Sequence, residues 1–150
     1  MRIALAEAQA AADAGETPVG AVILDPATGA VIAKAGNAPI GLHDPTAHAE
    51  IRAIRAAALA LGNYRLTGLS LFVTLEPCAM CAGAISHARI GRLVFAATDP
   101  KGGGVMHGPR VFDQPTCHWK PEVVEGPLAE ESAELLRGFF RARRAGQAPS

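Results

Sequence analysis

Residues 69–88 read LSLFVTLEPCAMCAGAISHA, and this stretch decides the fold expected for the chain. Residues 69–75 form a short apolar run, typical of a strand buried on both faces of a sheet. Glu76-Pro77 follows, and a proline in the first turn of a helix sacrifices no hydrogen bond. The stretch therefore predicts a buried strand that leads directly into a helix ending near residue 88.

The segments before this unit alternate between helix-like and strand-like patterns. An opening helix is expected over residues 3–14, ended by a glycine. Two β-type runs, 19–24 and 30–35, are joined by the turn-forming residues 25–29 and predict a hairpin. A further helix is predicted over residues 44–61, because Asp-Pro at its start resembles an N-cap followed by proline.

The segments after this unit complete the expected fold. Residues 93–97 predict a strand, and residues 99–122 predict an ordered surface loop with at most a short helix or an edge strand. A closing helix is expected over residues 129–144. This order indicates an α/β protein with three α/β/α layers around a mixed, about five-stranded sheet. The length suits a single domain over residues 1–150.

Composition excludes several classes of protein. Fourteen basic residues balance fourteen acidic ones, so only a local patch could attract nucleic acid. Three cysteines are too few for a disulfide framework and favour a reducing compartment. The charged start does not resemble a signal peptide, and the best apolar run, 56–61, is too short to cross a membrane. We expect a soluble cytoplasmic protein.

Three side chains form a candidate metal site. Cys78 and Cys81 lie three residues apart at a helix start, where the helix dipole favours the thiolate form that binds metals. Two buried cysteines or a redox pair would show the same spacing. His48 completes a nitrogen and sulfur ligand set suited to zinc and leaves one tetrahedral position open, as in catalytic sites. A closed structural site would need a fourth ligand, for which the candidates are His87, His107, Cys117 and His118.

Glu50 is the candidate proton shuttle of this site. It follows His48 by two positions, and its carboxylate could take a proton from an attacking water and deliver it to a substrate. Residues two apart in a regular helix do not face each other, so Glu50 would have to reach the site through its long side chain. The alternative is an ordinary solvated helix carboxylate.

The combined pattern His-x-Glu…Pro-Cys-x-x-Cys is the known signature of zinc-dependent nucleobase deaminases. Beyond the signature, nearly the whole chain resembles the bacterial tRNA-specific adenosine deaminases of the cytidine-deaminase-like superfamily. The segments that carry the resemblance are PVGAV (18–22), GNAPIG (36–41), HDPTAHAE (43–50), NYRL (63–66), LFVTLEPCAMCAGA (71–84), RIGRLVF (89–95) and FFRARR (139–144).

The resemblance implies a hydrolase that converts adenosine to inosine at the first anticodon position of a tRNA, acting as a homodimer with one zinc ion per chain. His48, Cys78 and Cys81 would be the ligands and Glu50 the proton donor. Asn37 falls where the family has a base-contacting amide, although it could be only a turn residue. Asp99 and Lys101 fall in a loop lining the anticodon groove, although Asp99 could be only a turn cap.

The last helix offers modest independent support for RNA, because arginines and aromatics alternate along it. Among them, Phe139 and Arg143 are candidate substrate contacts, since single-stranded RNA is held by phosphate neutralisation and base stacking. An amphipathic helix with phenylalanine in the core and arginine in solvent would show the same pattern. The residues concerned are Arg137, Phe139, Phe140, Arg141, Arg143 and Arg144.

Two other functions remain open at this point. A free-base or nucleoside deaminase, acting on guanine, cytosine or cytidine, would share the zinc chemistry. A zinc-stabilised binding module without catalysis would share the ligands, but Glu50 and the open ligand position argue against it. The segment 37–41 and the Arg/Phe tail favour a polymer substrate over a free base.

Overall fold

The computed structural model describes residues 1–147. Its centre is a five-stranded sheet with the order β2-β1-β3-β4-β5. Strand β1 (Gly20–Leu24) pairs antiparallel with β2 (Val31–Gly36) and with β3 (Ser70–Leu75). Strands β4 (Arg92–Ala97) and β5 (Glu122–Glu125) extend the sheet in parallel to β3. The mixed sheet expected from the sequence is confirmed.

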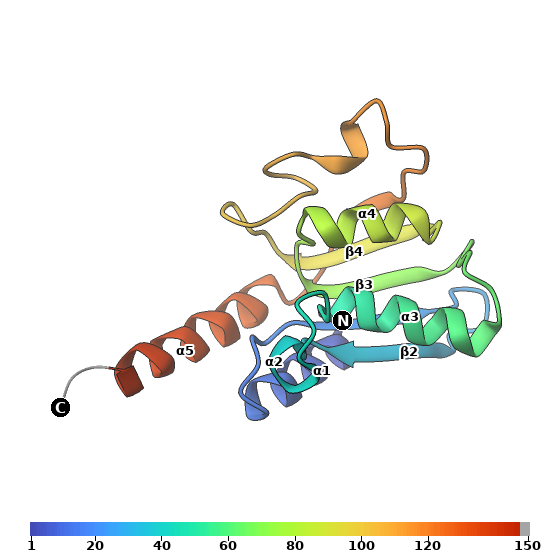
Figure 1. Ribbon diagram of the computed structural model, residues 1–150. Helices are drawn as coiled ribbons and strands as arrows, with labels where there is room; N and C mark the ends of the chain where they lie inside the picture. The colour runs from blue at the N-terminus through green and yellow to red at the C-terminus, as the bar shows by residue number, and fades with distance from the viewer. Residues whose placement is uncertain (148–150) are drawn as a thin grey trace.

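Helices cover both faces of this sheet (Figure 1). Helix α3 (Ala49–Leu61) and helix α4 (Ala79–His87) lie next to each other on one face. Helix α1 (Arg2–Asp13) and helix α5 (Ala129–Gln147) lie on the other, and the second half of α5 projects beyond the sheet (Figure 1). The short helix α2 (Pro39–Leu42) precedes α3. The three-layer architecture is therefore also confirmed. Within residues 1–147, no helix combines the length and the apolar character that crossing a bilayer requires.

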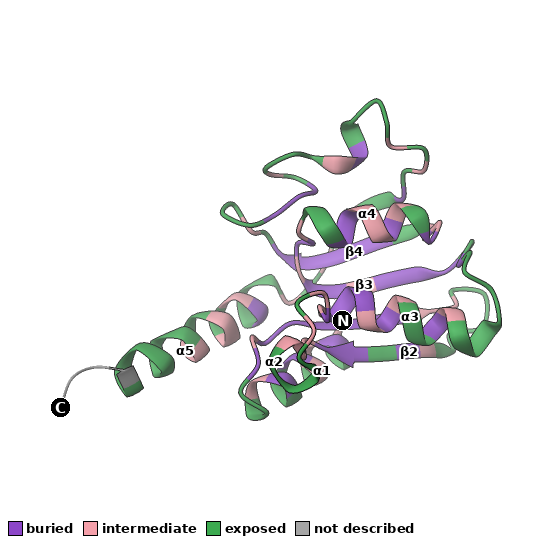
Figure 2. Ribbon diagram, in the orientation of Figure 1, coloured by how far each residue is buried: buried purple, intermediate pink, exposed green. Residues whose placement is uncertain are grey.

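The core lies between the sheet and its helices. Strands β1, β3 and β4 are buried along almost their whole length, as Figure 2 shows in purple, which agrees with the continuous apolar run 69–75. Helix α1 packs very closely on β1 through the buried Ala4 and Ala8. A Cβ atom at Gly20 would collide with the backbone of both residues, so glycine is required there.

The beginnings of two helices differ from the sequence-based prediction. The predicted helix 44–61 begins only at Ala49, because the Asp44 carboxylate accepts hydrogen bonds from the amide and the hydroxyl of Thr46. This local turn competes with helix formation and leaves the N-cap position to His48. Helix α4 likewise begins at Ala79, two residues after the proline.

The segment between β4 and β5 agrees with the prediction of an ordered loop with little regular structure. It contains one 3₁₀ turn, Val111–Asp113, and ends in the edge strand β5. It passes beyond the edge of the sheet next to α4 (Figure 1).

Candidate active site

The three predicted ligands meet where helices α3 and α4 begin. His48 is the N-cap residue of α3, Cys78 is the N-cap residue of α4, and Cys81 lies in the first turn of α4. The Nδ1 atom of His48 is 3.6 Å from the Cys78 sulfur and 3.5 Å from the Cys81 sulfur. Both helices therefore direct their positive ends toward the same point.

These three side chains fit a zinc ion. Zinc takes thiolate sulfur at about 2.3 Å and imidazole nitrogen at about 2.1 Å, so a tetrahedral ion separates the two ligand atoms by about 3.6 Å. The observed distances from His48 Nδ1 to the two sulfurs match this value. The residues thus form a compact group whose nitrogen and sulfur donors all face one another.

The two thiols differ strongly in acidity. The hydrogen bond with Cys81, and after it the neighbouring His48, lowers the pKa of Cys78 to about 5, although burial opposes this shift. The same hydrogen bond, together with burial and the adjacent Glu50, raises the pKa of Cys81. Cys78 is consequently a thiolate at neutral pH, the form in which cysteine binds metals.

Glu50 is buried, in the first turn of α3. Its burial raises the pKa of its carboxyl group above the usual range, which suits a group that must both accept and release a proton near neutral pH. The geometric difficulty raised by the sequence is removed, because His48 has an extended backbone and is not part of the regular helix. The carboxylate lines the same pocket as His48 and Cys78.

The alternative ligands lie elsewhere. His107 contacts Glu76 through its Nδ1 atom, and His87, Cys117 and His118 line a separate cavity beside α4. Within the described part of the chain, the metal-ligand group contains the three predicted side chains and no fourth. The arrangement is thus the open kind that catalysis requires.

A pocket of about 330 Å³ opens in front of the ligand group. Asn37 lines it, and its Oδ1 atom accepts a 2.7 Å hydrogen bond from the Ala49 amide, the first in helix α3. Asp99 also lines the pocket, and its Oδ1 atom accepts hydrogen bonds from the amides of Lys101 and Gly102. Both residues therefore have a structural contact as well as access to the pocket.

A larger groove of about 590 Å³ continues from this pocket toward helix α5, and Asp99 belongs to the walls of both. The groove is lined by four basic side chains and one aromatic side chain. They are Lys101, Arg137, Phe140, Arg141 and Arg144. Arg137 and Arg141 also pair with the exposed Glu134, and exposed ion pairs of this kind are weak and screened by salt.

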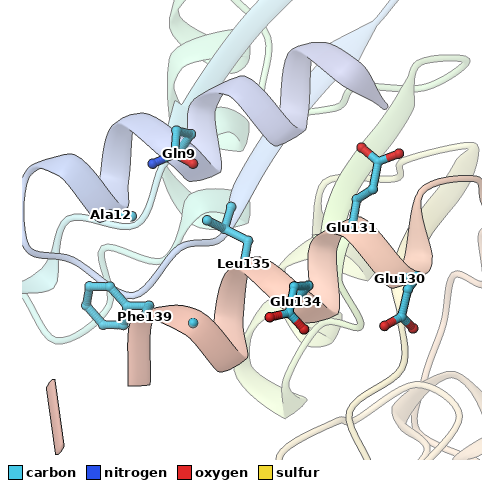
Figure 3. Close-up of a pocket in the computed structure, with 8 residues that line it drawn as sticks. Gln9, Ala12, Glu130, Glu131, Glu134, Leu135 and Phe139 are labelled. Carbon is cyan, nitrogen blue, oxygen red and sulfur yellow. The ribbon is translucent and has the colours of Figure 1, made fainter. Parts of the chain in front are cut away.

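The other two predicted substrate contacts lie apart from this groove. Phe139 faces helix α1 and lines a different groove, of about 670 Å³, between α1 and α5 (Figure 3). Arg143 stacks over the Phe139 ring at 5.1 Å. The lining of the α1–α5 groove includes three glutamates, Glu130, Glu131 and Glu134, each of which pairs with an arginine. This groove therefore offers phosphate less positive charge than the groove that Asp99 borders.

Sequence reasoning missed the contribution of Glu76. It was expected only to start a helix, but its side chain is fully buried and contacts the loop that follows β4. Burial alone would raise its pKa, but hydrogen bonds from Asp99, His107 and Met106 hold the pKa of this carboxyl below its usual value. The sequence did carry one signal, because Glu76 directly follows an apolar strand. A carboxylate buried at such a position needs several hydrogen-bond partners.

Comparison with known proteins gives the family. The model of the cytidine and deoxycytidylate deaminase zinc-binding region matches residues 1–97, and the chain belongs to this family of zinc-dependent deaminases. This agrees with the ligand group, which lies within the matched range.

Within this family, several relatives of the chain are tRNA-specific adenosine deaminases. The one from Agrobacterium fabrum is 57% identical over 145 residues, which cover 96% of this chain and 93% of the relative. A solved structure from work on A-to-I editing by tRNA:A34 deaminases superimposes with a TM-score of 0.88 at 55% identity, covering 91% of this chain and 97% of that one. Guanine deaminase from Nitrosomonas europaea shares the fold, with a TM-score of 0.80 at 24% identity over 92% of this chain and 81% of its own.

Proposed function

We propose that this zinc-dependent deaminase converts adenosine to inosine at the first anticodon position of a tRNA. His48, Cys78 and Cys81 hold the zinc ion, and Glu50 transfers protons. The groove of basic residues that continues from the active-site pocket carries the proposal. Its positive charge can neutralise the phosphates of an RNA, whereas a free base has no phosphate to bind. The 57% identity with a tRNA-specific adenosine deaminase supports the same substrate.

The buried side chains suit hydrolysis of the C6–N bond of adenine. A bound zinc ion supplies Lewis acidity that makes water nucleophilic at neutral pH. The Glu50 carboxylate accepts one proton from the attacking water and delivers it to ring nitrogen N1; it then takes the second proton from the new C6 hydroxyl and delivers it to the leaving amine. The C6–O bond forms, the C6–N bond breaks, and ammonia leaves. The free amide nitrogen of Asn37 can donate a hydrogen bond to the base, since its oxygen is occupied by Ala49.

Single-stranded RNA loops are recognised by stacking and by phosphate contacts. Lys101 and Asp99 stand where the pocket and the basic groove meet, so we place the flanking nucleotides there. Phe140, which is 41% exposed, is the better placed stacking platform. Phe139 and Arg143 stay predicted contacts that an RNA would reach only beyond this groove.

The test compares an anticodon stem-loop carrying adenosine at its first anticodon position with free guanine, cytosine and cytidine. Inosine formed in the RNA, with no turnover of the small molecules, supports the proposal. Faster turnover of guanine or cytidine than of the stem-loop would refute it.

A second measurement addresses the groove itself. Binding of the stem-loop should weaken with salt, and replacing Arg141 and Arg144 together by glutamine should flatten the log–log salt dependence by about 0.7 for every phosphate that is no longer neutralised. Arg92→Gln is the matched control, because Arg92 is exposed and paired with Glu122 at the far end of β4. Arg143→Gln tests the contact predicted from the sequence.

We also infer that the enzyme acts as a homodimer in the cytoplasm. The family resemblance supports the dimer, and the exposed Met80 and Met106 beside the active site offer apolar surface for a second copy. Its tRNA substrate and three free cysteines support a reducing compartment. Light scattering coupled to size-exclusion chromatography tests the dimer.

A further inference from the structure

The Glu76 carboxylate is an internal anion enclosed by donors from one loop. Its Oε1 atom accepts hydrogen bonds from the Asp99 amide at 3.1 Å and from His107 Nδ1 at 2.8 Å. Its Oε2 atom accepts from the successive amides of Val105, Met106 and His107, at 3.3, 3.0 and 3.1 Å. The side chain itself has no solvent-exposed surface.

Successive amides that converge on one point form a concavity that normally binds an anion. Here a side chain of the protein supplies the negative charge. Removing that charge would leave several polar groups without their acceptor, and an unsatisfied buried donor costs more than one hydrogen bond is normally worth. The conformation of residues 99–107 therefore depends on Glu76 to an unusual degree.

This loop connects the wall of the active-site pocket to the turn that carries the predicted zinc ligand Cys78. At its beginning, Asp99 and Gly102 line the active-site pocket. Further along, the Gly104 amide donates to the Pro77 carbonyl, 2.8 Å away and next to the ligand Cys78. Gly103 leaves no room for a Cβ atom, which would collide with the Glu76 carboxylate. The loop is thus fitted tightly between Glu76 and the turn that carries the ligand.

We propose that Glu76 is a positioning residue for deamination, which fixes the turn at Asp99 and Lys101 against the metal-ligand turn and thereby sets substrate affinity. Glu76 belongs to the wall of the active-site pocket, but its side chain has no solvent-exposed surface and its carboxylate oxygens accept hydrogen bonds from the loop. We therefore assign it a positioning role and no direct contact with the substrate. This proposal rests on the proposed function for the identity of the substrate, but not for the contacts that hold the loop.

The test uses Glu76→Gln in the zinc-loaded enzyme. This change keeps the size of the side chain but presents an amide donor to the donors of the loop. Zinc content should stay near one per chain, and hydrogen exchange at the amides of residues 105–107 should accelerate at least about tenfold. The KM for the stem-loop should rise by about tenfold to a hundredfold, with kcat much less affected. Asp113→Asn is the matched control, because it also neutralises a carboxylate of the same segment, but one that forms only an exposed ion pair with Arg110.

His107→Ala is the second variant and keeps the proposal testable if Glu76→Gln does not fold. It removes only the contact from Nδ1, so exchange and KM should change in the same direction, by about threefold to tenfold. An unchanged KM despite faster exchange, or a fall in kcat and zinc content at constant KM, would overturn the positioning role. If the parent enzyme leaves the stem-loop unmodified, the proposed function fails instead. In that case, amide hydrogen exchange and the KM for whichever free base the enzyme deaminates still test the positioning role of Glu76.

Discussion

Asn37 combines an observed capping contact with a proposed substrate contact, and the two can be separated atom by atom. Its Oδ1 atom caps the first amide of helix α3, and its Nδ2 atom is the part left to contact a base in the pocket. Replacing Asn37 by alanine removes both groups. Replacing it by aspartate keeps an acceptor for the Ala49 amide and even adds a negative charge at a helix N-terminus, but it removes the donor.

The two substitutions should therefore have different effects on stability. Loss of a capping hydrogen bond typically costs about 1 kcal/mol. For a domain of this size, that lowers the melting temperature by roughly 2–4 °C per kcal/mol. We expect this decrease for Asn37→Ala, whereas Asn37→Asp should unfold within about a degree of the parent.

Activity should decrease in both variants. Removal of a hydrogen bond to the base worth about 1.4 kcal/mol corresponds to a tenfold decrease in kcat/KM for the stem-loop. Differential scanning calorimetry and inosine formation, measured on the same zinc-loaded preparations, give both quantities. Full activity of Asn37→Asp would refute a donor role for Nδ2, and an unchanged melting temperature of Asn37→Ala would refute the capping role.

Four further outcomes are expected. Glu50→Gln should keep zinc but lose about a hundredfold or more of its turnover, as measured by inosine release. In zinc-free protein its stability should also fall less than that of the parent as pH rises, because burial raises the pKa of Glu50 in the folded state, so the parent loses stability as this carboxyl group ionises, and glutamine cannot ionise. Cys117→Ser should retain zinc and Cys78→Ser should lose it; equal losses by metal analysis would mean a closed structural site. Gly104→Ala should lower stability by about 1–3 kcal/mol in urea, because its Cβ would lie 2.6 Å from the Ala79 amide nitrogen.

The fold was predictable to the extent that it depends on hydrophobic patterning. The apolar run 69–75 and the hairpin at residues 19–35 show local signals of length, alternation and turn chemistry, and the structure has strands at both places. The start of α3 was not predictable in this way. Asp44 satisfied the rules for an N-cap, but its carboxylate is used within its own turn, and the competition between two local hydrogen bonds has no signature in sequence.

The site shows a similar division. Spacing and residue type were sufficient to identify His48, Cys78 and Cys81, because ligand chemistry is local and specific. The groove residues were harder to assign, because Phe139 and Phe140 differ by one position along a helix, which turns the two rings toward different grooves. The loop contacts of Glu76 span up to 31 positions and arise only when the chain has folded.

The position of the ligands at the starts of two different helices has a consequence for unfolding. His48 and Cys81 are 33 positions apart, so an ion that binds both closes a long loop containing α3 and β3. A cross-link over such a loop removes chain entropy from the unfolded state worth about 4 kcal/mol. Chelation should therefore lower the free energy of unfolding, and because the ion joins only the starts of α3 and α4, the α3–α4 layer should be the first to open locally. Hydrogen exchange would then report loss of the metal as partial unfolding on one face of the sheet.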